Sequence, residues 1–233
     1  MSIDKDYFNA RNVTFSTTGY IPQYLLPYLA TMHPESQFLD IGCGGGQFLF
    51  GLQAMGYKNL YGIDIEPHAV AWCNNHGLCV KSVNILDYKT EKKFDFIAMN
   101  HVLEHIEKNK IIDILAYIQK ELLAPDGYLY ITVPNAQSNT GCYWAYEDFT
   151  HTTLFTGGSL LYICSVAGIK NIEILDIDGL AHLPFLKKIL KKIFINIYKL
   201  NIDFWNYITL SYYHKPSPKI YTYEIKIIAQ KKR

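Results

Sequence analysis

Two acidic residues and a run of glycines occur with a spacing suited to binding a nucleoside-like ligand. Asp40 precedes three alternating glycines, which are Gly42, Gly44 and Gly46. Glycine allows a sharp bend and lets a ligand approach the backbone where a Cβ would clash. Asp64 follows about one β-α-β step later, where a carboxylate can accept both hydroxyls of a ribose. The dinucleotide pattern G-x-G-x-x-G is not satisfied, because its third glycine would fall at Gln47.

A second group of polar side chains, in residues 144–156, could act on a substrate. It contains the run Asp148-Phe149-Thr150-His151, just before a predicted helix that begins near Thr156. A neutral imidazole can take a proton from an alcohol, so His151 is a candidate general base. Asp148 would hold the imidazole or bind a substrate hydroxyl. The alternative is that the two side chains bond to each other and only brace the loop.

Apolar strands that end in these polar residues would position them. Strand and helix patterns alternate five times with short joins, which predicts a parallel sheet with helices on both faces. The expected strands are 38–41, 60–65, 78–83, 94–99, 128–133, 169–177 and 221–229. Parallel strands bring their carboxyl ends to one edge, so the acids and glycines would meet there.

Four motifs, taken in order, resemble the class I S-adenosylmethionine-dependent methyltransferases. They are F-L-D-I-G-C-G-G-G, G-I-D-I-E-P, V-L-E-H and L-A-P-D-G-Y-L-Y-I-T-V-P-N, and the resemblance covers about residues 36–180 and 219–231. It implies an α/β fold with a Rossmann-like, doubly wound, seven-stranded sheet, mostly parallel, whose last strand is antiparallel and lies at the sheet edge. It also implies S-adenosyl-L-methionine as the cofactor.

The cofactor contacts expected on this basis come from the ends of the first four strands. They are Asp40, Gly42, Gly44, Gly46, Asp64, Ile65, Asn84, Ile85, Asn100 and His101. Asn84 stands where the family usually has an acid that contacts the adenine amino group, and its carbonyl can accept the same hydrogen bond. Asp87 could take this role instead, or Asn84 could only shape the turn.

The two histidines of His101-Val102-Leu103-Glu104-His105 are four residues apart, as in a helical metal-binding pair. No H-E-x-x-H pattern or further ligand set accompanies them, so we expect no metal. We expect His101 to line the cofactor site, and Glu104 and His105 to fix the following loop.

The D-F-T-H run is similar to the substrate loop of bacterial methyltransferases of sugar and surface-polysaccharide synthesis. The resemblance implies methyl transfer to a hydroxyl of a sugar or glycan precursor. Tyr143, Trp144 and Tyr146 would form a stacking wall for a sugar ring or pack as ordinary core aromatics. Two alternatives stay open. One is O-methylation of a quinone-pathway phenol, and the other is a cofactor-binding protein without turnover.

The composition of the chain excludes several other classes of protein. Five scattered cysteines with no C-x-x-C pair indicate neither a disulfide framework nor a structural zinc site. We expect no signal peptide and no membrane-spanning segment, and therefore a cytoplasmic enzyme. Residues 1–182 carry 11 Lys or Arg against 19 Asp or Glu, a balance of −8, whereas residues 183–233 carry 11 against 2, a balance of +9. The acidic remainder would repel nucleic acid.

The basic carboxyl-terminal part contains an amphipathic helix at residues 185–200. Its apolar side chains fall on one arc and its lysines on the other. We expect it to pack on its own domain or on a second copy in a homodimer, or to contact an anionic membrane surface at the inner face of the membrane, where lipid-linked glycans reside. The predicted organisation is a helical cap at 1–35 and a methyltransferase domain at 36–233, with a basic helical insertion at about 181–216.

Overall fold

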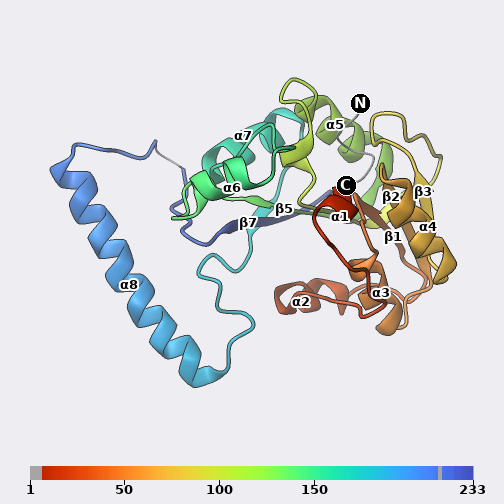
Figure 1. The fold of residues 1–233 in the computed structure, drawn as a ribbon, viewed down its shortest axis with the longest axis horizontal. Helices are drawn as coiled ribbons and strands as arrows, with labels where there is room; N and C mark the ends of the chain where they lie inside the picture. Colours follow the sequence, from red (N-terminus) through yellow and green to blue (C-terminus); the bar gives the residue numbers. More distant parts are fainter. Residues whose placement is uncertain (1–6, 215–216, 233) are drawn as a thin grey trace.

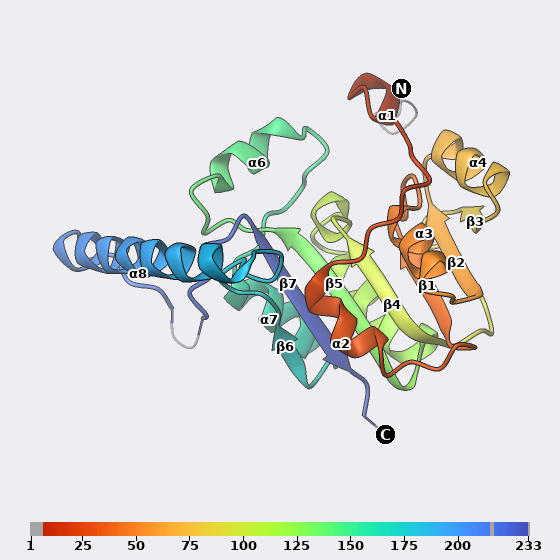
Figure 2. The same cartoon turned by 90° about the horizontal axis from the view of Figure 1, so that it is seen from below.

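The computed structural model describes residues 7–214 and 217–232. The parts of the predicted cap and insertion at 1–6 and 215–216 lie outside these residues. Seven strands form one sheet in the order β3-β2-β1-β4-β5-β7-β6 (Figures 1 and 2). Their bounds are β1 Gln37–Ile41, β2 Asn59–Asp64, β3 Cys79–Ser82, β4 Phe94–Asn100, β5 Leu123–Pro134, β6 Ile172–Ile174 and β7 Glu224–Gln230. The predicted seven-stranded, mostly parallel α/β fold is confirmed.

The strand order reverses between β1 and β4, and this reversal creates the ligand-binding edge. β2 and β3 follow β1 on one side, whereas β4 and β5 lie on the other, and all of these neighbours pair in parallel. The connecting segments therefore diverge above the carboxyl ends of β1 and β4, which leaves a crevice at the switch point.

The last strand, β7, does not lie at the edge of the sheet as we predicted. It pairs antiparallel with both β5 and β6, so β6 forms the edge. The reason is burial: β7 has five consecutive buried residues at 225–229, which is typical of a strand covered on both faces. β6 has only three residues and leaves its middle residue, Glu173, exposed, which suits an edge.

Helices cover both faces of the sheet. The short helices η2 (Gln23–Leu25) and α2 (Leu26–Leu29) pack with α3 (Gln47–Ala54) and α4 (Pro67–Asn75) in one apolar cluster. α5 (Ile111–Tyr117), η4 (Ile118–Leu122) and α7 (Gly157–Val166) belong to the other. These two layers hold the strands rigid and so fix the loops at their carboxyl ends.

Several helix boundaries differ from the sequence prediction. Residues 144–147, which we expected in the loop at 144–156, belong to helix α6 (Gly141–Glu147), and the loop begins at Asp148. η4 is a π-helical turn that follows α5, and β5 starts at Leu123, with a shift in its register against β4.

The amino-terminal segment lies across the carboxyl edge of the sheet. α1 (Tyr7–Ala10) leads into an extended stretch whose aromatic rings reach the glycine turn. A Cβ on Gly44 would come within 3.3 Å of the Phe8 ring, and a Cβ on Gly45 would meet Phe15 at 2.5 Å. The segment thus covers the turn at close range.

Helix α8 (Phe185–Ile208) projects from the side of the sheet that carries β6 and β7 (Figures 1 and 2). It is eight residues longer than predicted, and none of its residues is buried. Over the described part of the chain, we find no helix with the length and apolar character needed to cross a membrane.

Candidate functional site

A large cavity opens at the carboxyl edge of the sheet, above β1 and β4. Its volume is about 1460 Å³. This exceeds the roughly 300–1,000 Å³ typical of a single small-molecule site, so there is room for two ligands side by side. The predicted residues Asp40, Asp64, Asn100 and His151 all line it. The cavity therefore joins the predicted cofactor and substrate regions.

Gly42 and Gly44 of the glycine turn line the cavity, whereas the predicted Gly46 does not. Gly42, Gly44 and Gly46 all have positive φ, at 69°, 50° and 75°. A Cβ on Gly42 would lie 2.5 Å from a methyl carbon of Val102, so no other residue fits there. Asp64 closes the turn, since its carboxylate accepts hydrogen bonds from the amides of Gly44 at 2.7 Å and Glu66 at 2.9 Å. Asp64 thus stabilises the glycine turn, in addition to its predicted contact with a ligand.

Asp40 is a buried carboxylate at the end of β1. It is only 2% exposed, and among the described residues its Oδ1 has no hydrogen-bond partner. Burial, and then the nearby charge of Asp64, raises the pKa of Asp40 well above its usual range. A buried acid with an open oxygen, facing a cavity, is suited to binding a cationic group.

The other predicted cofactor residues also border the cavity. Ile65 is half exposed and Ile85 is buried, and both line the wall. Asn84 lines it too, but its Oδ1 accepts the amide of Leu86 at 3.0 Å, so this oxygen shapes the turn. Its amide nitrogen is the group left to face a ligand.

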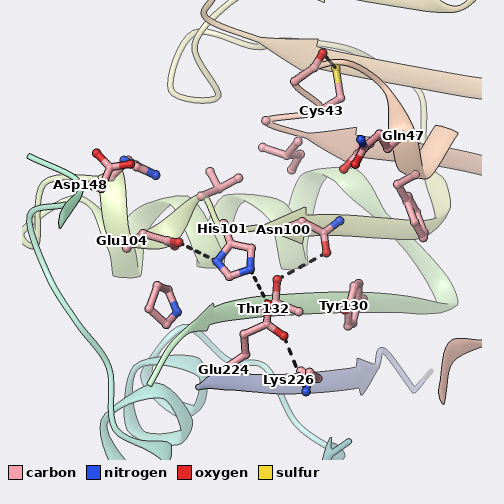
Figure 3. A pocket seen from close by; sticks show the side chains of 18 of the residues that line it. Cys43, Gln47, Asn100, His101, Glu104, Tyr130, Thr132, Asp148, Glu224 and Lys226 are labelled. Carbon is pink, nitrogen blue, oxygen red and sulfur yellow. Dashed lines mark hydrogen bonds and ion pairs between the residues drawn. The ribbon is translucent and has the colours of Figure 1, made fainter. Parts of the chain in front are cut away.

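His101 follows β4 with a φ of 53°, in the left-handed region. Its Nδ1 lies 3.1 Å from Glu104 and its Nε2 lies 2.9 Å from Glu224 (Figure 3). Although burial disfavours the charged ring, these two carboxylates raise the pKa of His101 to about 10. His101 is therefore a fixed cation at neutral pH. With both nitrogens occupied, it can be neither a general base nor a metal ligand.

His151 lines the cavity. Its Nδ1 lies 2.6 Å from the carbonyl oxygen of Trp144, which can only accept, so Nδ1 carries the proton and Nε2 keeps a lone pair. Asp148 lies 3.9 Å from Nε2, beyond hydrogen-bonding distance. The imidazole is thus held by the Trp144 backbone and not, as we expected, by Asp148.

Asp148 is instead the centre of a network that ties the substrate loop to the amino terminus. It accepts the Tyr7 hydroxyl at 2.5 Å, pairs with Arg11 at 2.8 Å and accepts the Thr150 hydroxyl at 2.6 Å. Burial opposes ionisation, but the hydrogen bonds from Thr150 and Tyr7 lower the pKa of Asp148 to about 2. Sequence reasoning missed Tyr7 and Arg11 because no motif marks them.

His105 joins the same network from the other side. The Thr150 hydroxyl donates to Asp148, so it accepts from His105 Nδ1 at 2.8 Å. The backbone oxygen of Glu104 accepts the amides of Thr152 and Thr153. These contacts hold the loop at 150–153, whereas we expected Glu104 and His105 to fix the loop that directly follows them.

One side-chain group has the donor set of a metal site. Glu104, His105 and His151 each place one ligand atom within 4.8 Å of the others. Glu104 is fully buried, and within residues 7–214 and 217–232 its Oε2 finds no hydrogen-bond partner. This group differs from the His101 and His105 pair that we considered. Our expectation of no metal stays a prediction.

Taken together, the strand-order reversal, the glycine turn and the two strand-end acids define a Rossmann-like methyltransferase fold. A family model described as a methyltransferase domain matches residues 17–174. This is more than half of the chain, so the protein belongs to this methyltransferase-domain family.

Solved structures share the fold over nearly the whole chain. An S-adenosylmethionine-dependent methyltransferase from Archaeoglobus fulgidus is 22% identical, with a TM-score of 0.64, covering 89% of this chain and 91% of that one. The 1,6-didemethyltoxoflavin-N1-methyltransferase of Burkholderia thailandensis, solved with its substrate and S-adenosylhomocysteine, is 17% identical, with a TM-score of 0.57 and coverages of 98% and 84%. A possible histamine N-methyltransferase from Thermotoga maritima is 16% identical, with a TM-score of 0.55 and coverages of 90% and 89%. These names cover different acceptors, so the likeness does not identify an acceptor.

Proposed function

We propose that this protein transfers a methyl group from S-adenosylmethionine to a hydroxyl of a sugar or glycan precursor. Membership of the methyltransferase-domain family supports the reaction class. The observation that carries the choice of an alcohol is the state of His151, which lines the cavity and whose Nε2 keeps a lone pair because the carbonyl oxygen of Trp144 engages the opposite nitrogen. An alcohol acceptor must lose a proton during methylation, and an amine need not use such a base.

The residues around the glycine turn fit the cofactor. Asp40 supplies an open carboxylate oxygen for the α-ammonium group, and the amides at the start of α3 suit the α-carboxylate. Asp64 and Ile65 stand where the ribose would lie, and Asn84 with Ile85 borders the adenine region. Asn100 and His101 form the wall between cofactor and acceptor. When bound, the cofactor supplies an electrophilic methyl group attached to a sulfonium.

The acceptor binds beyond His101, on the side of the cavity bordered by α8. The bound cofactor would supply the methyl group, and the acceptor hydroxyl would give its proton to Nε2 of His151. The imidazolium that forms lies 3.9 Å from the Asp148 carboxylate, which stabilises it. Asp148 also keeps the loop in place through Thr150.

The cavity lining includes side chains of the kinds that bind sugars. Carboxylates accept hydroxyl hydrogens and aromatic rings stack on sugar faces. The lining residues of these types include Tyr20, Trp144, Asp176, Asp178, Tyr198 and His182. Tyr143 and Tyr146, which we considered for a stacking wall, are 54% and 83% exposed and do not line the cavity. Only Trp144 of the three is placed to stack.

The test of this function is turnover by His151→Ala and His151→Gln. Loss of a general base lowers the rate by about 10²- to 10⁴-fold. We expect that loss with labelled methyl donor and fractionated sugar nucleotides or glycolipids, while donor binding by calorimetry stays within twofold. Turnover within about threefold of wild type would show that His151 is not the base.

The two alternative functions, O-methylation of a quinone-pathway phenol and cofactor binding without turnover, predict different results in the same assay. A quinone-pathway enzyme would methylate a polyprenyl phenol in preference to any sugar. A cofactor-binding protein without turnover would bind the donor tightly and label no fraction. Addition of EDTA distinguishes general-base catalysis by His151 from a mechanism that uses a metal bound by Glu104, His105 and His151. Only the metal-dependent reaction would become slower with the chelator.

A further inference from the structure

The outward face of α8 is mostly apolar, although Asn196, Asn201 and Asp203 are also exposed. Twelve large hydrophobic side chains of this helix are between 44% and 75% exposed, and Phe185, Leu186, Leu200 and Tyr207 are above 70%. The remaining members are Ile189, Leu190, Ile193, Phe194, Ile197, Phe204, Trp205 and Ile208. They follow the three-and-four spacing of a single helical stripe along 24 residues. An apolar stripe of this length on a free surface marks an interaction site.

Polar contacts on the opposite face hold the helix in this orientation. Lys191 Nζ donates to the carbonyl oxygen of Gly179 at 2.7 Å, and Lys199 Nζ pairs with Asp178 at 2.7 Å. The Tyr198 hydroxyl donates to Asn139 at 2.5 Å. The helix therefore uses its polar face to bind its own domain and turns its apolar face outward. This is the reverse of the internal packing that we considered from the sequence.

The charges around the stripe complement an anionic surface. Lys187 and Lys192 are exposed on its two borders, where their ammonium groups can reach out beside the apolar residues. The single acid of the helix, Asp203, pairs with Lys219 at 2.5 Å. Because residues 1–182 carry a balance of −8 and residues 183–233 one of +9, an anionic surface would repel the body and attract the end that bears α8.

We propose that α8 binds an anionic lipid membrane, lying in the plane of the interface with its apolar stripe among the acyl chains. The basic borders, the aromatic residues Trp205 and Tyr207 near one end, and the length of the stripe all suit this position. A second copy of the chain is the weaker occupant, since pairing two such stripes would bring their lysine borders together.

This placement has a consequence for the substrate that rests on the proposed function. Lys191, Ile195 and Tyr198, on the inner face of α8, line the same cavity as His151. The acceptor side of the cavity thus opens beside the membrane-bound helix. The acceptor is then a glycan joined to a lipid, with its sugar in the cavity and its hydrocarbon in the bilayer.

Vesicle flotation of the full chain tests the membrane contact without any measurement of methyl transfer. We expect binding to phosphatidylcholine vesicles that contain phosphatidylglycerol, and at least tenfold weaker partitioning for Leu190→Gln combined with Phe194→Gln. Neither residue is buried, so the fold should survive. The matched control is Val166→Gln on α7, which is 52% exposed and lies outside the stripe. It should bind like wild type.

Substitution of two lysines tests the electrostatic contribution to membrane binding. Lys187→Gln with Lys192→Gln should weaken binding to anionic vesicles by about tenfold or more, and added salt should weaken wild-type binding in the same way. Equal binding by wild type and both double variants would overturn the proposal. A wild-type dimer in light scattering that Leu190→Gln converts to monomer, without vesicle binding, would overturn it in favour of a second copy. His151→Ala should still float with vesicles, which separates this proposal from the catalytic one.

Discussion

Replacement of Asp148 by asparagine tests whether one carboxylate ties the substrate loop to the amino-terminal segment. Asp148 is 5% exposed and receives hydrogen bonds from Tyr7 and Thr150 and an ion pair from Arg11. A pKa lowered from 3.8 to about 2 means that the folded protein favours the ionised form by about 2 kcal/mol. Asp148→Asn keeps the shape and removes the charge, so we expect the free energy of unfolding at pH 7 to fall by about 2 kcal/mol.

The pH dependence of this loss follows from the sign of the shift. Because the folded-state pKa lies below the unfolded one, the stabilisation is fully present above about pH 4 and is lost as the pH falls toward 2. The difference between wild type and Asp148→Asn should therefore be largest at pH 7 and roughly half as large at pH 3. Urea unfolding followed by circular dichroism measures it. Glu91→Gln, which removes an exposed carboxylate, should change stability by under about 0.5 kcal/mol.

Two results would refute this account of Asp148. One is an unchanged free energy of unfolding at pH 7, which would mean that the network contributes nothing net. The other is a loss that stays constant between pH 7 and pH 3, which would locate the effect in packing and not in charge. Tyr7→Phe gives an independent check, since it removes one of the same hydrogen bonds and should lower stability by about 1–2 kcal/mol.

Two further predictions concern the cofactor side of the cavity. Asp64→Ala should weaken binding of S-adenosylmethionine by at least about tenfold in calorimetry, since it removes a charged acceptor and the anchor of the Gly44 amide; an affinity within twofold of wild type would contradict the cofactor assignment. His101 has a pKa raised to about 10 in the folded protein, so its contribution to stability is present below pH 6.5 and is lost as the pH rises toward 10. His101→Gln should therefore lose less stability than wild type between pH 7 and pH 10 in urea unfolding, and parallel pH profiles would show that the ion pairs do not contribute.

The parts of the fold that sequence predicted well are those fixed by local chemistry. The glycine turn needs positive φ at Gly42, and only glycine adopts it without strain beside Val102, so the motif and the geometry coincide. Helix α4 begins at Pro67, a residue suited to the first turn, and the Glu66 side chain caps it by accepting the amide of Ala69. Such features depend on residues that are close together in the chain, so a pattern of about ten residues is enough to predict them.

The features that sequence did not predict depend on distant partners. Tyr7 and Asp148 are 141 residues apart, and nothing in either neighbourhood indicates that they meet. The position of β7 between β5 and β6 is decided by which strand has two faces to bury, which is a property of the finished sheet. The periodicity of α8 predicted an apolar face correctly, but it could not tell whether that face turns inward.

The amino-terminal segment and helix α8 both border the cavity, and each is attached to the rest of the domain by its own contacts. The amino-terminal segment covers the glycine turn through Phe8 and Phe15 and is fastened at Asp148 by Tyr7 and Arg11. Helix α8 borders the opposite side through Tyr198. The contacts at Asp148 and those that hold α8 share no residue, so substitutions that release one set should leave the other in place.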